Sequence, residues 1–211
     1  MPVKDRGPKW TPDGKSLIFY SDRTGKYDIW RINIDGSNLK KLTNFEGMTS
    51  NPFLSPDGKS IICWIINNTV IFHPGSTANN QYMMLPDLNE KGFTFYATSV
   101  SPDGNYLAGN NENITDGNDN GILIYSLIQK KYRKISETGR NPEWLKDGKR
   151  IFFEDNNKFY LINAETGVQH LLYDPKIVFP KFDYLALSHD NKFIYYVNEE
   201  KESDIWMGYL K

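Results

Sequence analysis

Short apolar segments alternate with polar turns along the whole chain, and no segment shows a convincing helical period. In the first repeat, residues 8–10 form a short apolar segment, 12–15 a proline- and glycine-containing turn, and 16–21 a second apolar run. Residues 27–34 form a third run, and residues 39–43 alternate apolar and basic side chains as an exposed edge strand does. Because proline fixes one φ and glycine tolerates unusual ones, this pattern predicts four antiparallel strands joined by tight turns.

The same pattern recurs five times, and its turn carries the best-preserved residues. The turn aspartates are Asp13, Asp57, Asp103, Asp147 and Asp190, separated by 44, 46, 44 and 43 residues. A strand-rich period in the forties is typical of a β-propeller, with one four-stranded blade per repeat. We therefore predict an all-β propeller in a single domain over residues 1–211, with five recognisable blades. The approximate blade boundaries are 8–45, 51–95, 98–137, 141–174 and 184–211.

Two parts of the chain fit the repeat less well. Residues 73–95 break the pattern, which predicts an irregular outer part in the second blade. The fifth copy ends with its third strand, and residues 1–7 are short for a strand that completes it. Three interpretations follow: a five-bladed ring with a minimal latch, which we favour, part of a larger propeller, or a blade edge supplied by another chain. An unpaired edge would promote self-association.

The first repeat carries a family resemblance. Its residues are Trp10, Pro12, Asp13, Gly14 and Lys15, then Ser21-Asp22-Arg23, Asp28-Ile29-Trp30 and Leu42-Thr43. This series resembles the Pro-Asp type of WD40-like repeat found in TolB and in the propeller domains of tricorn and prolyl-oligopeptidase-type proteases. The resemblance implies a non-catalytic scaffold or sensor that docks protein or peptide partners in a bacterial extracytoplasmic compartment such as the periplasm. The first seven residues lack the apolar core of a signal peptide, so a chain that is full length as shown would be cytoplasmic.

The composition argues against several classes of partner and site. The 25 basic and 26 acidic residues give a net charge of −1, which argues against nucleic acid as a partner. No apolar run is long enough to form a transmembrane segment. The one cysteine, Cys63, lies in an apolar run and is expected to be a small core residue, so thiolate metal clusters are excluded.

Binding residues are expected on the face that carries the loops between second and third strands, opposite the Pro-Asp-Gly turns, because loops on rigid scaffolds carry function. The candidate ligand-binding residues are Asp22, Arg23, Asn110, Asn111 and Asp155. A structural role competes with this interpretation in the first blade. There, Asp28 and its neighbours are expected to form hydrogen bonds that hold the blade's own loop.

A calcium site is the less favoured interpretation of one loop. Asp116, Asn118 and Asn120 place oxygen-bearing side chains at alternate positions, as the first half of a calcium loop does. The twelfth position counted from Asp116 is Leu127, where that motif needs a glutamate. A turn-rich loop explains the same residues, and no other cofactor is expected.

The sequence gives little support to catalysis. The innermost strands offer Glu143, with Asp183 just before the last of them, as the two carboxylates that a glycosidase-like propeller would need. No Gly-x-Ser-x-Gly motif is present, and His73, His170 and His189 occupy unrelated places in the repeat. We therefore expect no enzyme. The alternatives are a glycoside hydrolase-like propeller acting on a polysaccharide, and the propeller domain of a larger peptidase or receptor-type protein.

Overall fold

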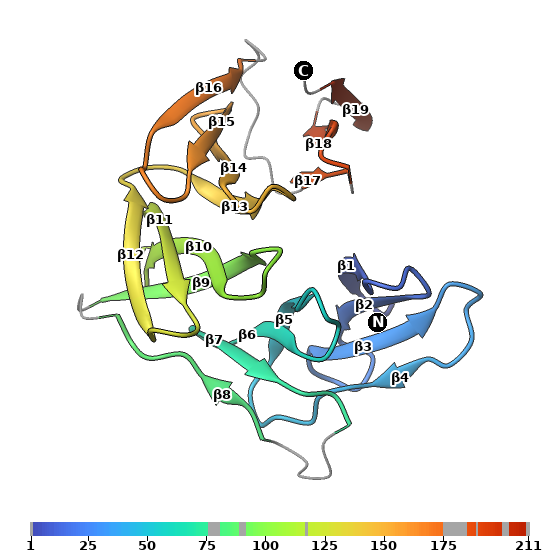
Figure 1. The fold of residues 1–211 in the computed structure, drawn as a ribbon. Helices are drawn as coiled ribbons and strands as arrows, with labels where there is room; N and C mark the ends of the chain where they lie inside the picture. The colour runs from blue at the N-terminus through green and yellow to red at the C-terminus, as the bar shows by residue number, and fades with distance from the viewer. Residues whose placement is uncertain are drawn as a thin grey trace.

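The computed structural model describes residues 2–75, 81–88, 92–116, 118–174, 185–188, 190–199 and 203–209. Within these ranges every regular element is a β-strand, and the strands form five antiparallel sheets. The sheets are arranged about a common centre, with β1, β5, β9, β13 and β17 innermost (Figure 1). The predicted all-β propeller arrangement is therefore confirmed.

Four sheets are complete four-stranded blades in sequence order. The first blade contains β1 (Asp5–Trp10), β2 (Ser16–Ser21), β3 (Asp28–Asn33) and β4 (Lys40–Lys41). The second contains β5 (Thr49–Leu54), β6 (Ile61–Ile65), β7 (Asn68–Phe72) and β8 (Met83–Met84). The third contains β9 (Phe93–Val100), β10 (Tyr106–Asn113), β11 (Asp119–Ser126) and β12 (Lys131–Ser136). The fourth contains β13 (Arg140–Trp144), β14 (Arg150–Asp155), β15 (Lys158–Asn163) and β16 (Gln169–Tyr173).

The fifth sheet is three-stranded, with β17 (Leu185–Leu187), β18 (Phe193–Glu199) and β19 (Ser203–Tyr209). The structure thus has four complete blades and a three-stranded sheet, where the sequence suggested five recognisable blades with the last one incomplete. The ribbon forms an incomplete ring, with the three-stranded sheet and the first blade on either side of its opening (Figure 1). The irregular outer part predicted for the second blade is seen as the two-residue strand β8.

The amino-terminal segment differs from expectation. The sequence offers residues 1–7 as a short latch for the last blade, yet Asp5 pairs with Ser21 and Arg6 with Tyr20 inside the first blade. The pairing continues because a bulge between Arg6 and Lys9 absorbs one change of register, and Gly7 takes a positive φ of 57° there. The segment extends β1 and pairs within its own blade.

The core lies in the seams between neighbouring sheets. In β6, Ile61 and Cys63 pack in the cluster shared with the first blade, whereas Ile62 packs in the cluster shared with the third. Side chains alternate along a strand, so a central strand between two sheets is apolar on both flanks. Cys63 is fully buried, as predicted, and burial raises the pKa of its thiol.

The turns between the first two strands share a hydroxyl–aspartate hydrogen bond in every sheet except the fourth, where Leu145 takes the place of the hydroxyl residue. Thr11 Oγ1 donates to Asp13 Oδ1 at 2.6 Å and accepts from the Ser16 amide at 3.0 Å. Ser55, Ser101 and Ser188 repeat this arrangement with Asp57, Asp103 and Asp190. These turns therefore hold the first pair of strands in register on one face of the molecule, called the turn face below.

Candidate functional site

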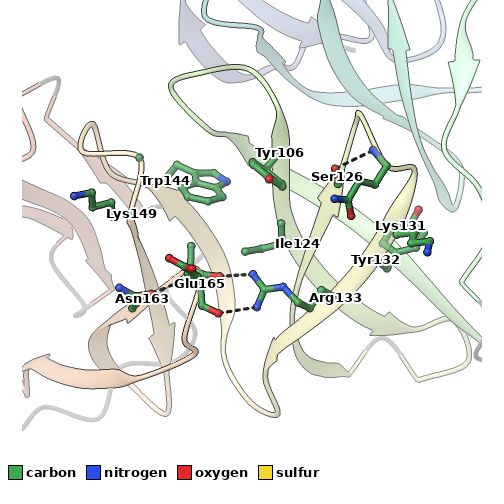
Figure 2. Close-up of a pocket in the computed structure, with 13 residues that line it drawn as sticks. Tyr106, Ile124, Ser126, Lys131, Tyr132, Arg133, Trp144, Lys149, Asn163 and Glu165 are labelled. Carbon is green, nitrogen blue, oxygen red and sulfur yellow. Dashed lines mark hydrogen bonds between the residues drawn. The ribbon is translucent and has the colours of Figure 1, made fainter.

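A cavity of about 770 Å³ lies in the seam between the third and fourth blades, on the turn face (Figure 2). Its walls come from β10, β11 and β12 of the third blade, and from the ends of β13 and β15 and the turns that follow them in the fourth. The side chains used below are Tyr106, Gln129, Lys131, Arg133, Trp144, Lys149 and Glu165. They sit on strands or tight turns, so the scaffold fixes their positions before any ligand arrives.

One repeated position in the core of this seam carries a small side chain. The residue four places after the turn glycine points toward the next sheet and is Ile18, Ile62 or Phe152 in the other complete blades. In the third blade it is Ala108. The corresponding cavity between the first and second blades, at Ile18, measures only about 250 Å³. Ala108 packs in the buried cluster with Ile124, Trp144 and Ala164, which line the larger cavity.

Two aromatic rings form one wall. The ring centroids of Tyr106 and Trp144 are 6.3 Å apart, and their planes are inclined by 34°. Trp144 is 9% exposed, and its indole Nε1–H has no acceptor among the described residues. Figure 2 shows this nitrogen on the edge of the ring that is turned toward Tyr106. This donor has almost no surface open to the cavity, so an acceptor from a ligand would reach it only after the Tyr106 ring turns aside.

The charged side chains of the cavity are mostly basic. Lys131 and Arg133 are alternate residues of β12, Lys149 comes from the opposite blade, and Glu165 is the acidic member. The Arg133 guanidinium crosses the seam and donates to the backbone oxygens of Ala164 and, at 3.5 Å, Glu165 (Figure 2). This link ties the outer strand of the third blade to the fourth blade and fixes the shape of the cavity between them.

The ligand residues predicted in the first and fourth blades lie on the loop face but are not gathered into one site. Asp22 accepts a hydrogen bond from the Lys4 amide at 2.8 Å. The Arg23 guanidinium pairs with Asp5 at 2.7 Å, and its carbon lies 4.8 Å from the ring centroid of Trp30. Asp155, in the fourth blade, accepts from Thr138 Oγ1 at 3.0 Å.

Asn110 and Asn111 lie within β10, where they are 6% and 1% exposed. Asn110 Oδ1 accepts from the Asn141 amide of the next blade at 2.9 Å. This bond assigns Asn110 a structural contact across the seam. Ligand binding by the five predicted residues stays a prediction.

Calcium binding by Asp116, Asn118 and Asn120 also stays a prediction. Asp116 and Asn118 are exposed, and Asp116 Oδ1 accepts from the Asn118 amide at 2.9 Å, as in an Asx-turn. The side chain of Asn120 lies outside the described part of the chain, as do Asp183 and His189. In the part that is described, no group of three His, Cys, Asp or Glu side chains is placed to hold a metal ion.

The other predicted carboxylate, Glu143, is half-buried on β13. Burial raises the pKa of this carboxyl, while Lys9 of the first blade and a hydrogen bond from the Leu187 amide act in the opposite direction. Glu143 thus joins the fourth blade to the fifth sheet near the centre of the ring. With Asp183 outside the described residues, the pair proposed for glycoside hydrolysis stays untested.

The structural role expected for Asp28 is confirmed. Its carboxylate is fully buried and receives hydrogen bonds from Lys26 Nζ at 2.9 Å, Thr43 Oγ1 at 3.1 Å and Thr24 Oγ1 at 3.2 Å. Lys41 Nζ lies 3.5 Å away. These contacts hold the β2–β3 loop against the edge strand of the same blade.

Comparisons with solved structures match this architecture. TolB from Acinetobacter baumannii superposes with a TM-score of 0.73 and 21% identity over 99% of this chain and 52% of that one. A putative TolB from Agrobacterium tumefaciens gives a TM-score of 0.76 and 14% identity, covering 99% of this chain and 78% of that one. The chain has a TolB-like β-propeller fold. An oligogalacturonate lyase also superposes, with a TM-score of 0.54 and 13% identity over 94% of this chain and 75% of that one.

Sequence comparisons give shorter matches to this TolB-like chain. An uncharacterised protein of Agrobacterium fabrum is 30% identical over 114 residues, half of this chain and 39% of that protein. The Tol-Pal system protein TolB of Francisella tularensis is 35% identical over 54 residues, 26% of this chain and 12% of that protein. An uncharacterised peptidase of Bacillus subtilis, YuxL, is 41% identical over 56 residues, 26% of this chain and 8% of that protein. The chain spans less than half the length of these relatives, and no protein-family model matches it.

The residues that build the seam cavity were missed in the sequence. Ligand residues were sought on the loop face, whereas the cavity opens among the turns. Two signals could have indicated it: Ala108 at a position that other blades fill with isoleucine or phenylalanine, and the four basic residues among positions 130–134. Among the described residues, no helix has the length and apolar character needed to cross a membrane.

Proposed function

We propose that this TolB-like propeller is a non-catalytic binding module that holds a peptide segment of a protein partner in the cavity between its third and fourth blades. The observation that carries the proposal is the combination of two aromatic rings and an unpaired buried donor in a cavity of about 770 Å³. Cavities of roughly 300–1,000 Å³ are typical of ligand sites. Such a site can receive a few residues of an extended chain.

The proposal moves the binding surface from the loop face to the turn face. Gln129, Lys149 and Glu165 belong to turns or strand ends around the cavity, so a partner can approach it without unfolding a blade. The amides of these three residues donate to Ser126 Oγ, Asp147 Oδ1 and Asn163 Oδ1, which hold the rim in place. A rigid rim lowers the conformational entropy that binding would otherwise cost.

The lining chemistry favours binding over catalysis. Glycoside hydrolysis by the usual route needs two carboxylates about 5–10 Å apart, and covalent catalysis needs a nucleophile beside a base. Among the described lining residues, Glu165 is the single carboxylate, and the basic groups are lysines and an arginine. These groups suit recognition of an acceptor-rich ligand.

The second candidate function is that of one domain in a larger protein. The matched relatives are more than twice as long as the part that this chain covers, and one of them is named a peptidase. In that setting the propeller would position partners or substrates for another domain. We include the extracytoplasmic location implied by the TolB resemblance in the proposal, and assays of culture fractions with an antibody to the native protein would test it.

An array of immobilised peptides of about twelve residues, varied in charge and aromatic content, tests the binding function. We expect wild-type protein to bind a subset of the peptides, and Tyr106→Ala, which removes one ring of the cavity wall, to lose that binding. Ile128→Ser, at a 71% exposed position of the same blade, is the matched control. Turnover of peptide or polysaccharide substrates by wild-type protein, lost in Glu143→Gln, would instead support an enzyme.

A further inference from the structure

The donors of the seam cavity outnumber its acceptors. The Trp144 Nε1–H is unpaired among the described residues although its side chain is nine-tenths buried. The residues at the same repeat position in the second and third blades, Leu54 and Val100, carry no polar group. Buried N–H groups are nearly always paired, so this one calls for an acceptor delivered from outside the chain.

Two of the side-chain acceptors in the lining are used by the chain itself. Asn163 Oδ1 accepts from the amides of Glu165 and Thr166 at 3.0 and 2.9 Å. Ser126 Oγ accepts from the Gln129 amide at 3.1 Å. A ligand that offers acceptors, rather than donors, therefore complements this lining.

The charge of the walls also favours a ligand that offers acceptors. Lys131 and Arg133 face the cavity from one blade and Lys149 from the other, against the single acid Glu165. The whole chain has a net charge of −1, so this basic excess is local. A carboxylate is the acceptor that such a lining attracts most strongly, because a charged hydrogen bond is about twice as strong as a neutral one.

We infer that the ligand of this site is an acidic peptide segment, with a carboxylate that lies in the field of Lys131, Arg133 and Lys149 and accepts from Trp144 Nε1 when the Tyr106 ring turns aside. This inference rests on the proposed binding function and specifies its ligand. Tyr106, which is 37% exposed, provides a ring face for an apolar neighbour of the acidic residue. An acidic sugar polymer shares the carboxylate and is the competing ligand.

Isothermal titration calorimetry with three capped hexapeptides provides the test. The first contains aspartate, glutamate and one phenylalanine, the second replaces each acid by its amide, and the third replaces each acid by lysine. We expect the acidic peptide to bind at least about tenfold more tightly than its amide counterpart, and less tightly as salt is raised. Trp144→Phe, which removes the N–H but keeps a ring, should weaken acidic binding about tenfold.

A second variant keeps the test valid if Trp144→Phe does not fold. Lys131→Ala should weaken binding of the acidic peptide about fivefold. Lys134→Ala, whose side chain lines the opposite flank of β12, should leave it unchanged.

Each outcome separates the inference from the proposed function. Equal affinity for the acidic and amide peptides would overturn the inference and leave the binding function intact. If none of the three peptides binds and no peptide of the array binds, both the inference and the proposed binding function are contradicted. Preferential binding of oligogalacturonate over the acidic peptide would overturn the choice of a peptide as the ligand.

Discussion

Trp10 and Trp144 occupy the same position of their repeats, four residues before the turn glycine, but are 57% and 9% exposed. Trp144 is covered because its flank of the fourth blade packs against the third. The corresponding flank of the first blade faces the opening of the ring, where no described sheet covers it (Figure 1). Leu17 shows the same contrast, since it is half-buried where Ile61 and Ile151 are 1% and 0% exposed.

The exposed flank of the first blade leads to a prediction about self-association. We expect the purified chain to associate in a concentration-dependent manner, and Trp10→Ser to shift it toward the monomer, because burial of a large aromatic side chain contributes about 2–3 kcal/mol. Light scattering over a range of concentrations measures the mass. Met48→Ser, at a 60% exposed position away from this flank, is the control. A strictly monomeric mass at all concentrations would contradict the prediction.

Asp28 should be the most sensitive polar residue of the first blade. Asp28→Ala leaves Lys26 and two threonine hydroxyls without their buried partner, so we expect a loss of about 3–5 kcal/mol in the free energy of unfolding. Asp28→Asn, which keeps the shape and loses the charge, should cost less. Chemical denaturation of both variants measures the effect. Asp35→Ala, in an exposed turn, should have little effect on stability, and an equal loss there would show that the buried network is not the cause.

Asn110 offers a way to separate structural and ligand-binding roles. Its hydrogen bond to the Asn141 amide crosses the seam, so Asn110→Ala should reduce the free energy of unfolding by about 1–2 kcal/mol. Asn118→Ala, in the exposed loop that follows β10, should have little effect. Normal stability of Asn110→Ala combined with lost ligand binding would restore the role that the sequence suggested.

The repeat could be predicted because its signals are local. A turn such as Thr11 to Ser16 closes with its own side chains, and flanking apolar runs such as that around Cys63 need only be buried on both sides to become central strands. Asp28 was correctly assigned to its own loop because several donors surround it in sequence.

The cavity could not be predicted because it depends on relations between repeats. Ala108 matters only once it is known to face the fourth blade, and Trp144 gains its role from Tyr106 of the neighbouring sheet. Residues 5–7 were misjudged for a different reason: the bulge at Gly7 lets pairing continue through a stretch without apolar alternation. The position of the site thus depends on packing between repeats, whereas the strands of each blade follow from local sequence.

Glu143 should make stability depend on pH. Burial raises the pKa of its carboxyl above the ordinary value of 4.5, so the folded state holds this proton more tightly than the unfolded chain does. The group's contribution to stability is therefore complete below the unfolded value and is lost as pH rises through the folded-state pKa. Glu143→Gln removes that loss and should gain stability relative to wild type as pH increases.

Thermal melts of both proteins from about pH 4 to about pH 8 measure this difference. Lys9→Ala provides an internal check, because Lys9 lowers the pKa of Glu143 and its removal should enlarge the pH-dependent loss. Glu137→Gln, whose side chain is 84% exposed, should follow wild type at every pH. Parallel curves for wild type and Glu143→Gln would mean that this carboxyl has the same proton affinity in the folded and unfolded chain, and that the contact between the fourth blade and the fifth sheet does not bury it.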